Sequence, residues 1–203
     1  MKRKFIKEFL FYPDVLLMTL ILLTFFTFMS FHISLTTLLA FLTGIIAYTI
    51  MEYFTHRFLF HSKPPKNAFL FKLMKRLHYD HHHSPNDLHL LFLPLWFSLP
   101  NIIIVGTITY FVTSNIVITI SFLTGVITLL LYYEFVHYIA HRPFHPKTPW
   151  GKWMKKVHIW HHYKNENYWF GVTNPGYDML LGTFKDQKDV EKSETAKQLD
   201  KKR

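Results

Sequence analysis

The sequence contains no cysteine among its 203 residues. This absence excludes disulfide bonds, cysteine-ligated zinc, iron–sulfur clusters and thiol nucleophiles. Any metal chemistry must therefore rest on His, Asp and Glu. Glycine is also scarce, with 7 residues against 21 Phe, 11 Tyr and 5 Trp. This composition excludes disordered and collagen-like chains and favours one compact unit.

Acidic residues are outnumbered, with 13 Asp and Glu against 23 Lys and Arg, which gives a formal charge of +10. Such a charge is compatible with nucleic-acid binding, but the mean hydropathy is positive and the basic residues lie between long apolar runs. That distribution suits a membrane surface better. We therefore expect a membrane environment and no nucleic-acid partner.

Charge is almost absent from four apolar runs, at about residues 14–31, 33–55, 91–113 and 116–140. Each run is close to the ~20 residues that span a bilayer as a helix. Pro94 and Pro100 blur the start of the third run. The runs predict an all-α integral membrane fold with four transmembrane helices in two hairpins.

Lys and Arg are asymmetrically placed around these runs. They lie at 2–7 before the first run, at 57–76 after the second and from 142 onward after the fourth, whereas the turns "FHIS" and "TSNI" carry none. The positive-inside rule then places both termini and the central loop in the cytoplasm. The first run is long and no A-x-A site follows it, so we expect an uncleaved anchor.

Histidines begin where the second and fourth runs end. "HRFLFH" holds His56 and His61, and "HYIAH" holds His137 and His141. Positions i and i+4 share a helix face, so His137 and His141 can bind one metal ion. Positions i and i+5 lie about 140° apart on an ideal helix, so we expect a frayed or unwound end at "HRFLFH".

Two HxxHH blocks, "HYDHH" and "HIWHH", complete the pattern. Their i, i+3, i+4 spacing places three imidazoles on one helix face in each block. The blocks contain His78, His81, His82, His158, His161 and His162. Ten imidazoles exceed the four ligands of a structural zinc site, so the spacing predicts two metal ions in a cytoplasmic helical cap. His32 and His89 are expected to be hydrated surface groups, and the roles of His83 and His145 stay open.

The order of these four motifs, with paired spans before the first and third, resembles the fatty acid hydroxylase and sterol desaturase superfamily. The resemblance covers nearly the whole chain apart from its ends. It implies a di-iron centre that activates O2, and metal-ligand roles for all ten histidines of the four motifs. Zinc could occupy the same ligands in vitro.

Two further segments resemble the fatty acid 2-hydroxylases, namely "SPNDLHLLFLP" and "YWFGVTNPGYDMLLGT". Leu90 stands where these enzymes typically carry Arg, and Tyr177 stands where Trp is frequent. The resemblance implies hydroxylation of a fatty acyl chain, with 2-hydroxylation favoured. A sterol or carotenoid hydroxylase or desaturase of the same superfamily is the alternative, and a His-rich membrane metal transporter or sensor is a more distant one.

Several polar residues lie near the histidines and are candidates for orienting them. Glu52 and Glu134 each lie about one helical turn before a histidine and can accept an imidazole N–H. The other candidates are Asp80, Asp87, Asn174 and Asp178. Pairing with Arg or Lys is an equal alternative for the two Glu, and solvation or turn formation for the other four.

Electrons are expected from outside the chain, because no C-x-x-C-H or GxGxxG motif is present. A separate cytochrome b5- or ferredoxin-type reductant would suit the basic face at Lys152, Lys155 and Lys156, although lipid headgroups are equally plausible partners. With no fused haem domain in 203 residues, we expect a bacterial inner membrane rather than the endoplasmic reticulum. Residues 1–184 form the expected membrane domain, and residues 185–203 form a charged, disordered tail without chemistry.

Overall fold

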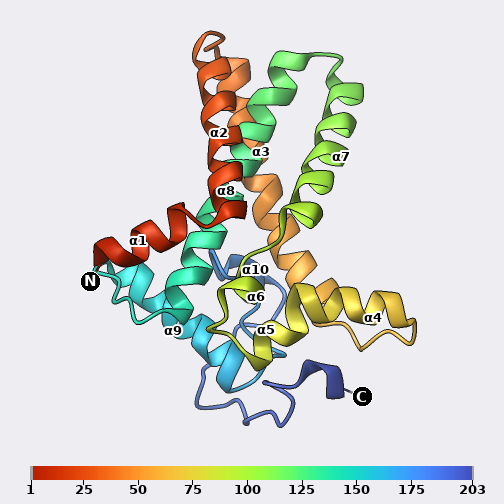
Figure 1. Ribbon diagram of the computed structural model, residues 1–203, viewed down its shortest axis with the longest axis vertical. Helices are drawn as coiled ribbons and strands as arrows, with labels where there is room; N and C mark the ends of the chain where they lie inside the picture. The colour runs from red at the N-terminus through yellow and green to blue at the C-terminus, as the bar shows by residue number, and fades with distance from the viewer. Residues whose placement is uncertain (1, 203) are drawn as a thin grey trace. The chain divides into compact units, whose positions relative to one another are not determined.

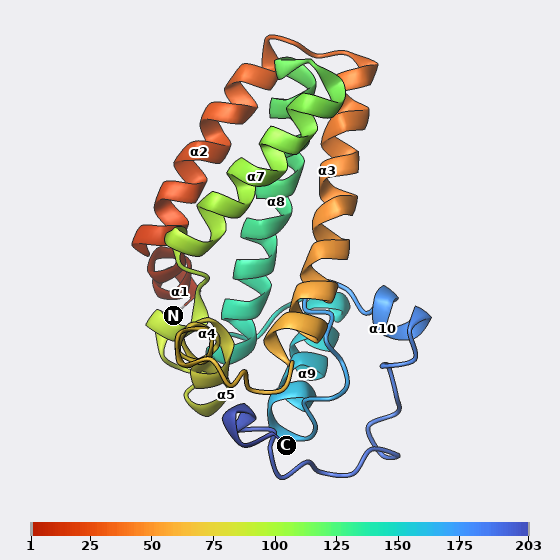
Figure 2. The same cartoon turned by 90° about the vertical axis from the view of Figure 1, so that its right-hand side faces the viewer.

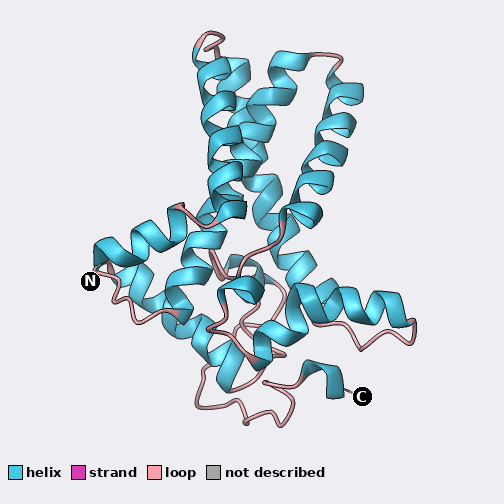
Figure 3. Cartoon of the chain, in the orientation of Figure 1, coloured by secondary structure: helices cyan, strands magenta, loops and turns pink. Residues whose placement is uncertain are grey.

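The computed structural model describes residues 2–202, and its regular elements in that range are all helical (Figure 3). This confirms the predicted all-α class. The chain divides into two compact units, the first with residues 1–49 and 93–134 and the second with residues 50–92 and 135–203. Two of the three boundaries between the units fall inside long helices, so these two helices contribute residues to both units.

The first unit holds the apolar helices. They are α1 (Lys2–Leu10), α2 (Pro13–Ser30), most of α3 (Leu35–Phe54), α7 (Leu95–Thr113) and most of α8 (Ile116–His141) (Figures 1 and 2). Pro13 begins α2, where a missing N–H breaks no helical hydrogen bond. Pro94 caps α7, whereas Pro100 lies inside it.

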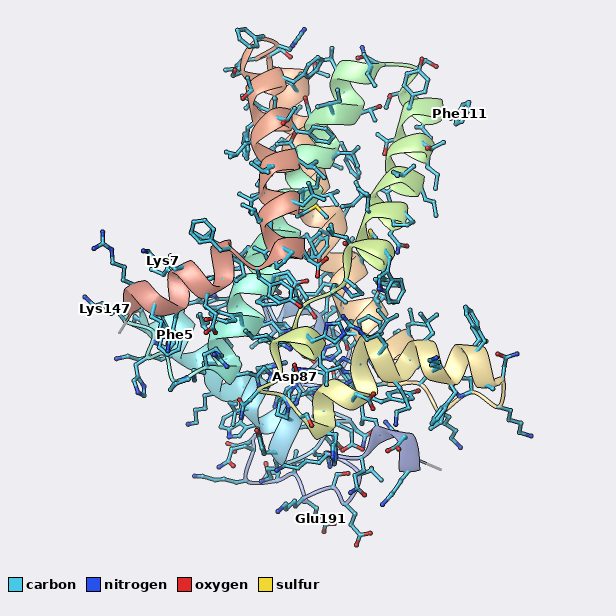
Figure 4. All side chains as sticks on the ribbon, viewed as in Figure 1. Phe5, Lys7, Asp87, Phe111, Lys147 and Glu191 are labelled. Carbon is cyan, nitrogen blue, oxygen red and sulfur yellow. The ribbon has the colours of Figure 1, made fainter. Side chains whose placement is uncertain are left out.

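Four segments are long and apolar enough to cross a membrane, at 13–30, 35–60, 88–113 and 116–141. Their bounds agree with the predicted runs to within a few residues. Large apolar side chains point outward from them, and Figure 4 shows Phe111 projecting from α7. Apolar side chains on the outside of long helices suit a lipid environment, where they need no polar partner. The chain is therefore a multi-pass membrane protein.

α3 and α8 approach each other closely in the first unit through two glycines. A Cβ at Gly44 would lie 2.0 Å from the backbone oxygen of Phe122, and a Cβ at Gly125 would lie 2.0 Å from that of Phe41. Any larger residue must push the helix backbones apart. Small residues that permit this approach are typical of helix contacts in membranes.

The second unit holds shorter elements that connect and follow the long helices. They are the π-helices Thr55–Phe60 and Lys75–Tyr79, the α-helices α4 (Ala68–Met74), α5 (Asp80–His83), α6 (Leu88–Leu91), α9 (Pro149–Tyr163) and α10 (Gly176–Leu180), and a 3-10 turn at Leu199–Lys201. Asn67 and Thr148 cap α4 and α9 by accepting backbone N–H groups. The ends of α3 and α8 also belong to this unit.

The tail differs from the disordered segment expected from its charge. Residues 185–202 carry three apolar side chains, Val190, Ala196 and Leu199, and all three are buried. Val190 packs in one cluster with Val157 and Trp169. These buried side chains hold the charged segment onto the second unit together with hydrogen bonds from Ser193 to the Lys164 carbonyl and from Trp169 to the Lys185 carbonyl.

Candidate metal centre

The second unit gathers the ten histidines of the four motifs into two groups of five. Group one contains His56, His61, His78, His82 and His161. Group two contains His81, His137, His141, His158 and His162. Within each group the potential ligand atoms lie within 4.8 Å of one another, and every one of the ten side chains is buried.

A π-helix brings the first pair together. The backbone N–H of His61 donates to the carbonyl of His56 at 3.1 Å, which is an i to i+5 hydrogen bond. Such a turn holds one more residue than an α-helical turn, so residues five apart come onto one face. The expected irregularity at "HRFLFH" is thus present, but as an overfilled helical turn rather than an unwound end.

Each HxxHH block is divided between the two groups. The first block supplies His78 and His82 to group one and His81 to group two. The second block supplies His161 to group one, and His158 and His162 to group two. The spacing placed three rings on one face, but neighbouring rings on that face diverge enough to belong to separate groups. Residue spacing alone does not contain this division.

The ring nitrogens of group one offer more lone pairs than N–H donors, which favours a cation between them over hydrogen bonds among the rings. In group one, His61 Nε2 lies 3.2 Å from His56 Nε2 and 3.0 Å from His161 Nε2. The Nδ1 atoms of His56 and His161 face backbone carbonyls, so their N–H groups lie there and their Nε2 atoms carry lone pairs. His61 has one N–H at most to offer, and the buried Nε2 of His82 has no protein partner among the described residues.

Group two also brings ring nitrogens close together. His137 Nε2 lies 2.9 Å from His81 Nε2, and His141 Nε2 lies 2.9 Å from His158 Nε2. Both ring nitrogens of His162 are buried without a hydrogen-bond partner among the described residues. Inward lone pairs with no donor are the condition that a metal ion relieves. Each group could therefore hold a metal ion.

Burial keeps these rings neutral. Desolvation lowers the pKa of His82 to about 3, although the hydrogen bond to the Ala196 carbonyl opposes the change. The pKa of His61 and of His162 also falls well below the ordinary value, because burial and then neighbouring imidazoles disfavour the charged form. A neutral imidazole is the form that binds metal.

Three backbone carbonyls orient the rings of group one. His56 Nδ1 donates to the Phe170 carbonyl at 2.5 Å, and His161 Nδ1 donates to the Tyr168 carbonyl at 2.7 Å. His82 Nδ1 donates to the Ala196 carbonyl at 2.8 Å. These bonds fix the tautomer and turn Nε2 inward, as outer partners of metal-binding histidines do.

The loop that carries the first two carbonyls has an unusual backbone. Trp169, which lies between them, is fully buried and has a φ of 59°, in the left-handed region that bulky residues avoid. A Cβ at Gly171 would lie 2.1 Å from the Asn174 backbone oxygen, so only glycine fits there. Strained backbone held in place by its surroundings is typical of functional sites.

Two predicted carboxylates hold this loop rather than the imidazoles. Glu52 Oε1 accepts the N–H groups of Val172 and Thr173 at 2.8 and 2.9 Å, and Oε2 accepts the Thr173 hydroxyl at 2.5 Å. Asp178 Oδ1 accepts the Phe170 N–H, and Oδ2 accepts the Gly171 N–H at 2.7 Å. The predicted bond from His56 to Glu52 is therefore wrong, because His56 donates to the Phe170 carbonyl. The two carboxylates instead bind the backbone N–H groups of the loop that carries this carbonyl.

The other predicted carboxylates and Asn174 have local partners. Glu134 Oε1 accepts the Leu93 N–H at 3.1 Å and therefore binds the backbone just before α7. Asp87 is the exposed cap of α6, and Asp80 pairs with Lys75 at 3.2 Å. Asn174 Oδ1 accepts the Gly176 N–H, which is turn chemistry. For Asp87 and Asn174 the structural alternatives describe the observed contacts, whereas Glu134 accepts a backbone N–H instead of pairing with Arg or Lys and Asp80 forms an ion pair.

The basic face of α9 is smaller than predicted. Lys155 donates to three carbonyls at the end of α8, those of Ile139, Arg142 and Phe144, at 2.6–2.9 Å. It therefore caps the helix that carries His137 and His141. Lys152 and Lys156 remain exposed.

The four remaining histidines, His32, His83, His89 and His145, are exposed and belong to neither group. Sequence reasoning missed the carbonyls of Tyr168, Phe170 and Ala196, because a backbone acceptor leaves no side-chain signature. It also missed Glu166, a fully buried carboxylate four residues after His162. An acidic residue so close to a metal-binding motif was the available signal.

Comparison with known proteins places the site in a family context. The model of the family described as "Fatty acid hydroxylase" matches residues 41–183. Fatty acid 2-hydroxylase of Rattus norvegicus is 31% identical over 147 residues, which are 70% of this chain and 38% of that protein. Dihydroceramide fatty acyl 2-hydroxylase FAH2 of Arabidopsis thaliana is 30% identical over 150 residues, which are 69% of this chain and 58% of that protein.

A solved structure described as full-length scs7p, with only the hydroxylase domain visible, has a TM-score of 0.78 and 25% sequence identity. The superposition covers 89% of this chain and 68% of that chain. The chain therefore matches less than two thirds of the length of the rat and plant relatives, 38% and 58% respectively.

Proposed function

Since this chain belongs to the fatty acid hydroxylase family, we propose that it is a membrane-bound, O2-dependent oxidoreductase that hydroxylates a fatty acyl chain, favouring carbon 2. The convergence of ten buried imidazoles into two groups is the observation that carries the proposal. The names of the relatives, which are fatty acid 2-hydroxylases and a dihydroceramide fatty acyl 2-hydroxylase, support the substrate class and the carbon attacked.

The ten histidines are the proposed ligands of two iron ions, one for each group. When bound, such a pair would supply the oxidation of a C–H bond to C–OH by O2, with two electrons and two protons forming water from the second oxygen atom. The protein's own contribution is to position the imidazole rings. The rings are held neutral by burial, and those of His56, His82 and His161 are fixed by backbone carbonyls.

Exclusion of water is a second contribution of the chain. All ten ligand side chains are buried, and Phe170 packs edge-on against His56 with ring centroids 5.9 Å apart. A dry, apolar surrounding strengthens electrostatic interactions at the metals and limits side reactions with solvent.

The membrane context supports a lipid substrate and a cytoplasmic site. An acyl lipid reaches a membrane enzyme by lateral diffusion, and the distribution of Lys and Arg around the four spans supports a cytoplasmic location for the ends of the second and fourth spans. A separate cytochrome b5- or ferredoxin-type protein would supply electrons, with the exposed Lys152 and Lys156 available to an acidic partner.

The decisive experiment is expression in a host that lacks 2-hydroxy lipids, followed by mass spectrometry of total fatty acids. We expect new 2-hydroxy fatty acids with the wild-type chain and a loss of at least about 100-fold with His161→Ala, which removes a ligand. His83→Ala is the matched control, because His83 is exposed and outside both groups. Wild-type lipids without new oxygen would refute hydroxylation, and new double bonds instead would identify a desaturase.

A further inference from the structure

The C-terminal segment 185–202 runs along the end of α9 and the loop that follows it (Figures 1 and 2). The Ser193 N–H donates to the Lys164 carbonyl at 2.7 Å, and Asn165 Nδ2 donates to the Glu191 carbonyl at 3.0 Å. The indole of Trp169 donates to the Lys185 carbonyl at 3.0 Å. These bonds attach the segment at several points to residues that directly follow His161 and His162.

A buried carboxylate makes one of these attachments strong. Glu166 is fully buried, and its Oε1 accepts the hydroxyl of Thr195 at 2.6 Å and, in a longer bond, Asn167 Nδ2 at 3.4 Å. Its Oε2 has no hydrogen-bond partner among the described residues. A buried carboxylate with so few donors depends heavily on each one, because burial of an unpaired charge is costly. Thr195 therefore ties the segment to the loop after α9.

The next residue reaches the metal centre. The Ala196 carbonyl accepts the Nδ1–H of His82 at 2.8 Å. Ala196 is buried, as is Leu199 beyond it, and Lys202 Nζ donates to Asn167 Oδ1 at 2.6 Å. Of the three carbonyls that orient group one, this one alone lies beyond residue 183, where the family match ends.

We propose that residues 185–202 form a strap that positions His82 for metal binding, so that the ion of group one, but not that of group two, depends on the charged C-terminal segment. The proposal rests on metal occupancy of the histidine groups, as the proposed function does. The strap acts through Thr195, which fixes the segment on Glu166, and through the Ala196 carbonyl, which fixes the ring. Without it, the His82 ring loses the bond that selects its tautomer and orientation.

The test is metal binding by the purified chain of residues 1–203 and by a variant that ends at Ser193. This truncation removes Thr195 and Ala196 but leaves Val190, whose packing holds the first half of the segment. After reconstitution with Fe(II) or Zn(II), elemental analysis should give about two ions per chain for the wild type and about one for the truncated chain. Two tightly held ions in a truncated chain of unchanged helicity would overturn the proposal.

A point variant guards against failure of the truncated chain to fold. Thr195→Val should weaken the affinity of one of two ions by roughly 10- to 100-fold, and Thr195→Ser, which keeps the hydroxyl, should restore it. Visible absorption of Co(II)-loaded protein gives a second readout, which should change in Thr195→Val and return in Thr195→Ser. Glu194→Gln, at the neighbouring exposed position, is the matched control and should behave as wild type.

These measurements separate the strap from the enzymatic activity. A wild-type chain that binds two ions, loses one in Thr195→Val and forms no hydroxylated lipid would refute the proposed function and keep the strap. Equal affinities in Thr195→Val and Thr195→Ser would refute the strap whatever the activity. A wild-type chain that binds no metal would refute both.

Discussion

Asp178 and Glu52 show how single buried carboxylates position the metal centre without touching it. Asp178 is fully buried and accepts two backbone N–H groups and the Thr183 hydroxyl, the last at 2.6 Å. Burial raises the pKa of Asp178, and these hydrogen bonds oppose the increase by favouring the carboxylate. The residue thus uses its charge to hold the Phe170 backbone, whose carbonyl holds His56.

Asp178→Asn should disturb this loop. The amide replaces one acceptor oxygen with an NH2 group that faces a donor, which leaves a buried N–H or hydroxyl unpaired. We expect a loss of roughly 1–3 kcal/mol in the free energy of unfolding, together with weaker metal binding. Thermal melting in detergent and elemental analysis would measure the two effects. Asp87→Asn should be close to neutral, because Asp87 is an exposed helix cap and Asn caps equally well.

The long helices depend on close packing at defined positions. Gly44 and Gly106 differ in what an added side chain would meet. A Cβ at Gly44 would lie against the backbone oxygen of Phe122, whereas a Cβ at Gly106 would meet only the end of the flexible Leu123 side chain, at 2.8 Å. The difference lies in what can move aside. A Leu side chain can change rotamer, but a helix backbone carbonyl moves only if α3 and α8 separate.

Gly44→Ala should therefore destabilise the first unit more than Gly106→Ala does. For Gly44→Ala we expect a loss of about 1–3 kcal/mol, typical of overpacking, and for Gly106→Ala a much smaller one. Chemical unfolding of the two variants in the same detergent provides the comparison. Equal stability of the two variants would contradict the inferred contact between α3 and α8.

At the scale of the whole molecule, ten buried imidazoles make stability depend on pH. Above about pH 6.5 a histidine is neutral in both the folded and the unfolded chain, so it contributes no pH dependence. Below that pH the unfolded chain gains protons, while His82, with a pKa of about 3, stays neutral in the folded chain. The free energy of unfolding therefore falls as pH drops from about 6.5 toward about 3.

Metal-free protein should consequently melt at a lower temperature at pH 5 than at pH 8. Each fully buried histidine contributes up to about 1.4 kcal/mol per pH unit in this window. A variant with His32, His83, His89 and His145 replaced by Gln should keep the effect, because these four residues are exposed. A melting temperature independent of pH between 8 and 5 would show that the rings are not buried in neutral form.

Sequence patterns were sufficient to predict the helical class, the four apolar spans and the histidine motifs, because hydrophobic run length and the i, i+3 and i+4 spacings are local properties. The division of each HxxHH block required the folded chain, since it depends on which rings of other elements lie opposite. The folded chain also decided the roles of Glu52, Glu134 and Lys155, whose partners lie elsewhere in the chain.

The tail is the clearest case of this difference. Its charge predicted disorder, but three buried apolar side chains and a carbonyl bonded to His82 place it beside group one. A backbone carbonyl has the same chemistry at every residue, so only its position in space can make it part of a metal centre.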